Sequence, residues 1–317
     1  MAQDALSQIF NALKMRGTIY FHTNLTAPFG LQVPQYRNVA RFHMALRGQC
    51  WVRIEGVAEP VSLAAGDLVV IPHGVPHILS DTPERKAVAL DDVLQRTGYK
   101  GEGALVYGGA KNGHANQLFC GHFEFDEGVM HPLLDALPSH IHIANTESMN
   151  ASWLEPVMRF VSAEVMGSGA GSNAIIHRLT EIIFIQVVRA FVNKMGDAAG
   201  TLAGVLDPQL SKALAEVHAA PEKPWTVNDM ARVAGMSRTL FAQKFTALIG
   251  MTPLGYVTQW RMQMAKRALV ESKKPEIEIA ESIGYQSESA FARAFKREFN
   301  ATPSQMRRAG SVAQLNS

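Results

Sequence analysis

The sequence predicts an α+β protein with a β-rich first half and an all-helical last third. Between Gly17 and Asp126, short runs of β-branched, aromatic and aliphatic residues are separated by Gly and Pro, which is typical of a sandwich or barrel. Residues 174–195 are apolar almost all round a helix, so more than one helix face is buried. Residues 226–303 contain one helix-turn-helix pattern twice.

The chain opens with an amphipathic helix over residues 4–15, whose apolar stripe is Leu6, Ile9, Phe10 and Leu13. The clearest candidate strands follow at residues 18–21, 40–46, 50–54, 67–71 and 117–125. A short helix over residues 130–138 and a strand over 141–143 close this part of the chain.

The segment from Gly66 to His77 reads Gly-Asp-Leu-Val-Val-Ile-Pro-His-Gly-Val-Pro-His. A glycine, five residues and then Pro-x-Gly-x-x-His resembles the second motif of the cupin family. Residues 46–49 resemble the end of the first cupin motif, but its His-x-His pair is missing and Arg41 falls near the place of its glutamate. The resemblance covers roughly residues 15–130 and implies a cupin-like β-barrel that senses an effector.

Cupin enzymes typically hold a metal ion with three His and one Glu, and only His77 carries over by motif. His43 has the strand parity of an inward side chain, and Cys120 lies on another candidate strand. These three residues form a chemically reasonable zinc set, with a fourth place for His122, His73 or water. The alternative is that they are packed histidines and a buried, inert thiol.

Cys50 and Cys120 are the two cysteines of the chain. Some proteins that carry such a sensing barrel resemble oxidant sensors in having a Cys-Gly step like Cys120-Gly121, so a redox switch is a further hypothesis. A Cys50–Cys120 disulfide would need Cα atoms within about 7 Å. So few cysteines favour a reducing compartment.

Two long helices are expected next, over residues 152–166 and 174–195, with a glycine-rich break between them and Asn173 as the N-cap of the second. One face of the second helix covers the barrel, and we expect the other to form a C2 dimer through residues such as Ile183. A further helix runs from Asp207 to Val217, and residues 219–224 link it to the last third. The tail after Gly310 is expected to be disordered.

The repeated pattern of the last third is related by an offset of fifty positions, which pairs Phe241 with Phe291 and Phe245 with Phe295. Thr226, Ser237 and Ser287 are expected N-caps. Gly235 and Gly284 stand where each turn needs a residue that tolerates positive φ. Residues 254–271 are expected to form one continuous helix between the copies. This helix would hold the two base-reading helices at the separation of adjacent major grooves on one duplex face, about 34 Å.

This segment, from Trp225 to Arg308, resembles the DNA-binding domain of AraC/XylS-type transcription regulators. The matching residues are Ile279-Ala280, Ile283-Gly284-Tyr285, Ser289, Phe291, Arg293, Phe295-Lys296-Arg297 and Thr302-Pro303-Ser304. Asn300 replaces the glycine usual before the final Thr-Pro, which Asn tolerates because it also visits the left-handed region. The resemblance implies base-reading positions at Arg238, Thr239, Ala242 and Gln243 in the first copy and at Ser289, Ala290 and Arg293 in the second. Lys296 and Arg297 are available for phosphate.

A paired helix-turn-helix is also compatible with a protein-interaction module, and exposed Arg and Lys are usually solvated surface. The charge distribution favours DNA. Residues 221–317 hold 14 Lys or Arg against 8 Asp or Glu, whereas residues 1–220 hold 16 against 20. The basic excess is therefore confined to the part that would face phosphate.

The predicted domains are a cupin-like sensing barrel (1–145), a helical dimerisation and linker segment (146–220) and an AraC-type DNA-binding domain (221–310). We expect a cytoplasmic homodimer, not an enzyme, whose partners are promoter DNA, a small-molecule, metal or oxidant effector and, for an activator, RNA polymerase. No signal peptide or membrane span is apparent. The alternatives are a cupin-type metalloenzyme with a DNA-binding appendage and an architectural DNA binder without effector, which a barrel filled by side chains would favour.

Overall fold

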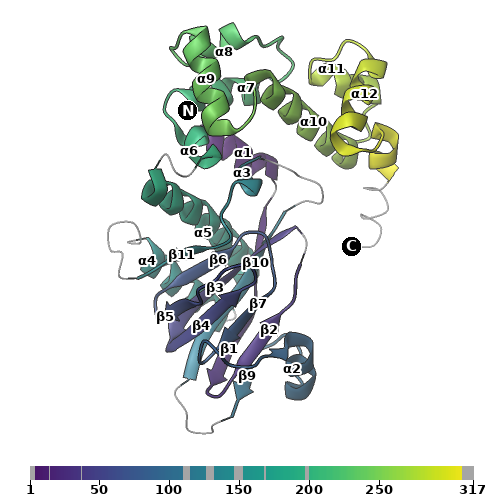
Figure 1. The fold of residues 1–317 in the computed structure, drawn as a ribbon. Coiled ribbons are helices and arrows are strands. Elements are labelled where there is room, and N and C mark those ends of the chain that lie inside the picture. The colour runs from purple at the N-terminus through teal and green to yellow at the C-terminus, as the bar shows by residue number, and fades with distance from the viewer. Residues whose placement is uncertain are drawn as a thin grey trace. The chain divides into compact units, whose positions relative to one another are not determined.

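The computed structural model describes residues 4–13, 15–36, 38–109, 115–125, 132–145, 153–167, 169–196 and 200–308. The chain divides into two compact units. The sheet unit comprises residues 14–128 and 137–196, and the helical unit comprises residues 1–13, 129–136 and 197–317. Both are drawn in Figure 1. The tail after Gly310 and the start of the helix expected at 130 lie outside the described residues.

The sheet unit contains a six-stranded sheet of order β11-β6-β3-β10-β1-β9 and a five-stranded sheet of order β5-β4-β7-β2-β8. The strands are β1 (Arg16–Thr26), β2 (Gly30–Val33), β3 (Val39–Arg47), β4 (Gln49–Ile54), β5 (Val61–Ala64), β6 (Leu68–Ile71), β7 (His77–Ser80), β8 (Val88–Ala89), β9 (Ala104–Gly108), β10 (Ala115–Glu124) and β11 (Ile141–Ile143). Every strand expected from the sequence is present.

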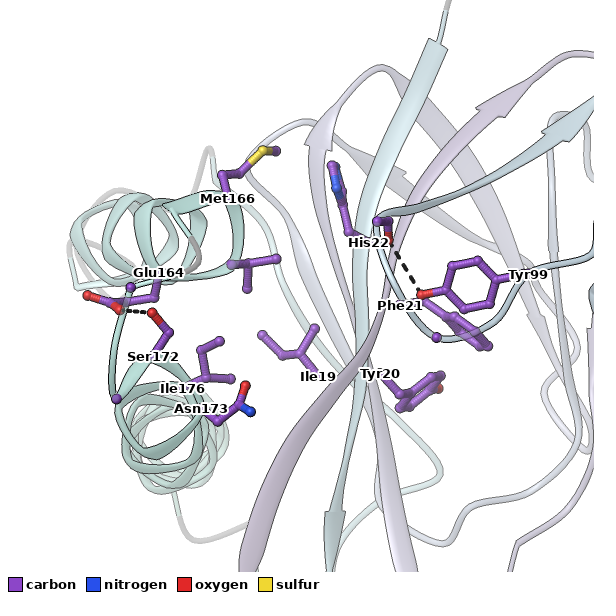
Figure 2. Close-up of a pocket in the computed structure, with 15 residues that line it drawn as sticks. Ile19, Tyr20, Phe21, His22, Tyr99, Glu164, Met166, Ser172, Asn173 and Ile176 are labelled. Carbon is purple, nitrogen blue, oxygen red and sulfur yellow. Dashed lines mark hydrogen bonds between the residues drawn. The ribbon is translucent and has the colours of Figure 1, made fainter.

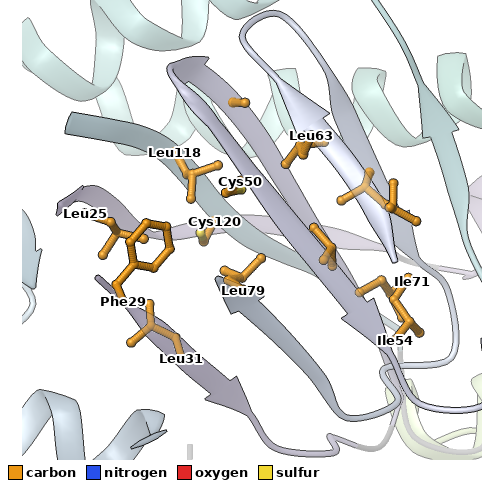
Figure 3. Packing of buried hydrophobic residues seen from close by; sticks show 14 of the residues in the cluster. Leu25, Phe29, Leu31, Cys50, Ile54, Leu63, Ile71, Leu79, Leu118 and Cys120 are labelled. Carbon is orange, nitrogen blue, oxygen red and sulfur yellow. The ribbon is translucent and has the colours of Figure 1, made fainter. Parts of the chain in front are cut away.

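A shared apolar core joins the two sheets (Figure 3). Leu25 and Leu118 come from the six-stranded sheet, and Val52 and Leu79 come from the five-stranded one. All four are at most 2% exposed. The described strands thus form two packed sheets and not the closed barrel that the sequence suggested, while the cupin-like architecture is retained.

Helices α4 (Leu154–Gly167) and α5 (Ser172–Met195) belong to the sheet unit. The buried face of α5 packs on the six-stranded sheet, where Phe184 contacts Phe123 and Phe125. The residue at the N-cap of α5 is Gly171, which has no side-chain cap, so the prediction of Asn173 at that place was wrong. Asn173 lies instead in the first turn.

One close approach fixes α5 against β1. Thr180 of α5 is fully buried, and a Cβ at Gly17 of β1 would lie 2.0 Å from its Oγ1. The His177 ring nitrogen Nδ1 also contacts the Gly17 carbonyl oxygen. Helix and strand therefore meet at Gly17 with no room for a side chain.

The helical unit comprises α1 (Ala5–Leu13), α3 (Pro132–Asp135), α6 (Thr201–Leu206), α7 (Leu210–Ala219), α8 (Val227–Val233), α9 (Arg238–Ile249), α10 (Pro253–Glu271), α11 (Glu276–Ser282) and α12 (Glu288–Phe299). The first helix of the chain packs on α6 and α7. His218 of α7 contacts both α1 and α10. The His218 Nδ1 atom lies 3.2 Å from Gln8 Oε1 of α1, and its Nε2 atom lies 2.8 Å from the Tyr256 hydroxyl of α10. This unit thus includes helices outside residues 221–310, whose boundaries as a DNA-binding domain stay a prediction.

The local signals of the helix-turn-helix copies are confirmed. Thr226 forms a capping box with Asp229, and Ser237 and Ser287 accept hydrogen bonds from the backbone N–H groups of Leu240 and Ala290. Gly235 and Gly284 have positive φ angles of 66° and 86°. Asn300 takes the left-handed conformation at the C-cap of α12. Each turn is therefore specified by residues within or beside it.

Adding one methyl group at Gly17 should loosen the contact between α5 and β1. We expect Gly17→Ala to lower the free energy of unfolding of the sheet unit by about 1–3 kcal/mol, because Thr180 has no room to move. Amide hydrogen exchange of β1 in rising urea measures this change. Gly167→Ala is the control: its Cβ would meet nothing within 4 Å, so we expect a change within about 0.5 kcal/mol. Equal effects of the two changes would contradict the close contact.

Candidate functional site

Helix α9 presents a polar N-terminal face. Its buried side is set by Phe241 and Phe245, which are both 0% exposed. The predicted base-reading residues lie on the other side: Arg238, Thr239 and Gln243 are exposed and Ala242 is half-buried.

Helix α12 repeats this arrangement with Phe291 and Phe295 buried. The predicted residues on its outer side are exposed (Ser289, Arg293, Lys296 and Arg297) or half-buried (Ala290). Among the described residues, no carboxylate forms an ion pair with Arg238, Arg293, Lys296 or Arg297. Lys244 of α9 is different, because its Nζ lies 2.6 Å from Asp207 Oδ2. The two reading helices thus keep cations available for an anionic partner.

Helix α10 joins the two copies without a break. Tyr256 and Trp260 pack in the first half of the helical unit, where the Trp260 ring stacks on His218 at 3.8 Å between centroids. Met262 and Leu269 belong to the core of the second copy. At 19 residues α10 is about 28 Å long. The separation of the reading helices expected from the sequence stays a prediction.

The interior of the sheet unit holds the residues proposed for metal binding. His43 lies on β3 of one sheet and His77 on β7 of the other, and their Nε2 atoms are 2.8 Å apart. Both rings are buried. Cys120 is the cross-strand partner of His43, and His122 is the partner of Arg41. The expectation that His43 approaches His77 is therefore correct.

These residues do not assemble a metal site. Within the described ranges, no three His, Cys, Asp or Glu side chains are placed so that they could hold one ion. His43, His77, Cys120 and His122 are all described, so the zinc set suggested from the sequence is not formed. His73, the other candidate, hydrogen-bonds through Nε2 to the Leu137 carbonyl oxygen at 2.9 Å.

Burial keeps this interior uncharged apart from Arg41. Desolvation lowers the pKa of His77 and of His122 to about 4 each. The pKa of His43 lies well below its ordinary value because of desolvation, His77 and Arg41, in that order. The imidazoles are therefore neutral at pH 7.

Arg41 is a buried cation without a described carboxylate partner. Its side chain is 5% exposed, its Nε has no hydrogen-bond partner, and its guanidinium lies 3.9 Å and 4.9 Å from the ring centroids of Tyr36 and Tyr20. These aromatic faces stabilise the charge through cation–π contacts. By the cupin resemblance Arg41 falls near the place of the first motif's glutamate, and a buried cation there disfavours a bound metal ion.

Cys50 and Cys120 are free and buried, and Figure 3 shows them in the same apolar core. Desolvation raises the pKa of Cys50 to about 12 and raises that of Cys120 as well. Both are thiols at neutral pH, and the thiolate is the form that oxidants attack. The structure therefore weighs against the redox hypothesis.

A cavity of about 650 Å³ lies outside the two sheets, between β1 and the α4–α5 pair. Figure 2 shows Ser172, Asn173 and Ile176 on its helical wall, across from Ile19 of β1. A smaller cavity of about 200 Å³ reaches His77 between β2, β4 and β7. No sequence pattern predicted the larger cavity, because the cavity depends on where a helix diverges from a strand.

The two parts of the chain match two different families of known proteins. Residues 4–193 match the Cupin family and residues 230–309 match a helix-turn-helix domain family. The chain is 32% identical over 305 residues to the HTH-type transcriptional regulator AlkR of Acinetobacter baylyi, covering 96% of this chain and 99% of that protein. It is also 31% identical to an AraC-like transcription regulator of Streptomyces lividans, covering 85% of this chain and 87% of the relative.

The chain belongs to the AraC family of transcription regulators. It is a DNA-binding regulator with an N-terminal cupin domain. One similar solved structure is the DNA-binding domain of AdpA in complex with a target DNA, at 27% identity and a TM-score of 0.33, covering 34% of this chain and 98% of that one. None of the helices in the described ranges of this AraC-family protein combines the length and apolar character needed to cross a bilayer.

The neutral histidines make stability pH-dependent. In the unfolded chain a histidine takes up a proton near pH 6.5, whereas burial holds the pKa of His77 at about 4. The unfolded state therefore binds more protons between these values, so the free energy of unfolding falls as pH is lowered from 6.5 towards 4. We expect His77→Gln to make this fall shallower, by up to about 1.4 kcal/mol per pH unit. Urea unfolding of both proteins at pH 7, 6 and 5 measures the two slopes, and parallel slopes would contradict the neutral state of His77.

Proposed function

We propose that this AraC-family regulator reads promoter DNA with the exposed faces of α9 and α12. Arg238, Thr239, Ala242 and Gln243 read bases in one major groove, and Ser289, Ala290 and Arg293 read bases in the next. Lys296 and Arg297 bind phosphate. The observation that carries the proposal is that each capped helix presents an exposed Arg, Arg238 at the start of α9 and Arg293 midway along α12, that forms no ion pair with a described carboxylate.

The same proposal assigns control to a small organic effector bound by the cupin unit. The unassembled metal set and the raised pKa values of both buried thiols weaken the metal and redox alternatives for the signal. An effector acts by binding better to one arrangement of the protein than to another, which shifts the population that binds DNA.

The described residues bear differently on the two rival functions. A cupin-type metalloenzyme would need a set of metal ligands, and no three candidate ligands in the described ranges are placed to hold one ion. An architectural DNA binder without effector was expected to have an interior filled by side chains, and the packed apolar core between the sheets supports that rival. The cavity outside the sheets, however, offers an effector another place.

We also propose that α4 and α5 form a dimer interface. Four large apolar side chains on these two helices are 43–56% exposed: Phe160, Met166, Ile182 and Met195. Ile183, the residue chosen from the sequence, is 0% exposed within the sheet unit and was the wrong test of this interface. The outward face of α5 carries Ile182 instead.

DNA binding is tested with the full chain and fragments that it selects from a random duplex library. We expect affinity to fall steeply with salt. Arg293→Ala should cost about 1–3 kcal/mol on a selected site and relax base preference there. Lys296→Ala should weaken binding to all sequences alike and reduce the salt slope by about one. Fluorescence anisotropy measures both, with Arg96→Ala on α2 (Leu90–Thr97) of the sheet unit as the control. Equal losses from Arg96→Ala and Arg293→Ala would refute the assignment.

The dimer is tested with Ile182→Asp, which places a carboxylate on the proposed interface. We expect the sedimentation coefficient to change from that of a dimer to that of a monomer. Val106→Asp is the control, because Val106 is an exposed apolar residue of the same unit (61%) that lies on β9 and not on either helix of the proposed interface. If wild type and Ile182→Asp have the same mass in analytical ultracentrifugation, this interface does not exist.

A further inference from the structure

The larger cavity lies where α5 separates from β1. At Gly17 the strand and Thr180 of the helix are in direct contact. Further along the strand, towards the start of the helix, Ile19 and Ile176 line opposite sides of the cavity. Its volume of about 650 Å³ falls within the range of pockets that hold drug-sized ligands, roughly 300–1,000 Å³.

The wall of this cavity is divided between apolar and polar side chains. The apolar side chains come from both sides: Ile19 and Phe21 from β1, and Val165, Met166 and Ile176 from α4 and α5. The polar side chains are as numerous: His22, Tyr99, Glu164, Ser172 and Asn173. In pockets for organic ligands apolar surface supplies affinity and polar groups fix orientation, and this wall offers both.

His22 has an unsatisfied ring nitrogen. Its ring packs at 5.3 Å from that of Phe119, and its Nε2 is shielded from solvent without a hydrogen-bond partner. Burial lowers the pKa of His22, so the ring is neutral at pH 7. A buried polar atom without a partner destabilises the structure, and the χ2 torsion of His is soft. A rotation of the His22 ring about χ2 would bring Nε2 to a ligand hydroxyl in the cavity, and the hydrogen bond so formed would satisfy this buried atom.

Charge disfavours anionic ligands. Among the described lining residues, Glu164 carries the charge and there is no Lys or Arg. Its Oε2 accepts a hydrogen bond from the Ser172 hydroxyl at 2.9 Å. A carboxylate or phosphate brought beside this carboxylate would be repelled.

We infer that this cavity is the effector site of the regulator and that it binds an uncharged organic molecule with an apolar ring or chain and a hydroxyl group. The ring or chain of the ligand packs between Ile19 and Ile176, and its hydroxyl bonds to His22 and Asn173. The site lies outside the two sheets and so does not use the interior around His43 and His77. The inference rests on the proposed function for its role as an effector site, whereas the binding itself does not depend on it.

The position of the cavity supplies a route to control. Its helical wall is the α4–α5 pair, which also carries the exposed apolar residues Phe160 and Ile182. A ligand held between β1 and the start of α5 favours one angle of that helix on the sheet, because the contact at Gly17 keeps the helix in place further along. Binding is thereby coupled to the proposed dimer interface.

Three naphthalene compounds test the site by isothermal titration calorimetry with the full chain. 2-Naphthol is uncharged at pH 7 and has a hydroxyl, naphthalene has none, and 2-naphthoate is an anion. We expect 2-naphthol to bind, naphthalene to bind about five- to tenfold more weakly for want of one hydrogen bond, and 2-naphthoate to bind more weakly than either. Tighter binding of 2-naphthoate, or no binding of any of the three, would overturn the inference.

Two variants place the ligand in this cavity. Ile176→Trp fills the space and should abolish 2-naphthol binding, whereas Ala174→Trp, on an exposed part of the same helix turn, should leave it unchanged. His22→Phe keeps a ring but removes both nitrogens, so the preference for 2-naphthol over naphthalene should shrink at least threefold. Unchanged binding in Ile176→Trp would place the ligand elsewhere and refute the site.

DNA affinity measured in the same samples separates the two proposals. Loss of 2-naphthol binding in Ile176→Trp, with salt-dependent DNA binding intact, supports the effector site. A protein that binds 2-naphthol as expected but binds no DNA would refute the proposed function and leave the ligand site standing. A protein that binds DNA but none of the three compounds would refute the ligand site alone.

Discussion

Burial of two phenylalanines on each of helices α9 and α12 orients the faces that we propose to contact DNA. Phe241 and Phe245 fix the inner side of α9, and Phe291 and Phe295 fix that of α12. Because residues four apart share a helix face, these buried rings place the intervening polar and basic side chains on the outer face. The N-caps at Ser237 and Ser287 then set where each helix begins. The residues available for the proposed base contacts are therefore a consequence of the apolar packing beneath them.

The sheet unit keeps cupin architecture while its interior has lost the chemistry of a metal site. Arg41 falls near the place that the cupin resemblance gives to a glutamate, its guanidinium is buried, and two neutral histidines bond to each other across the sheets. Positive charge of this kind disfavours a cation nearby. Arg41 and the two histidines thus give a physical reason why this interior forms no metal site, in keeping with our proposal that the effector binds outside the sheets.

Features specified by neighbouring residues were predictable. The capping box at Thr226, the left-handed Asn300 and the approach of His43 to His77 each follow from spacing or strand parity. Features that depend on three-dimensional packing could not be predicted from the sequence. An apolar helix does not reveal which face turns inward, so Ile183 was confused with Ile182. Neither α2 (Leu90–Thr97) nor α6 was expected, and the cavity depends on the angle between α5 and β1.

The packing of α1 on α6 and α7 bears on how such regulators diversify. The helical unit is assembled from three separate stretches of chain, two of which precede or interrupt the sheet unit. Recombination exchanges contiguous gene segments, so a single crossover that brings in a new C-terminal half would also bring a surface fitted to a different first helix. Exchange of reading heads between relatives therefore has a natural boundary after α7, where the acquired segment leaves the α1 contact intact.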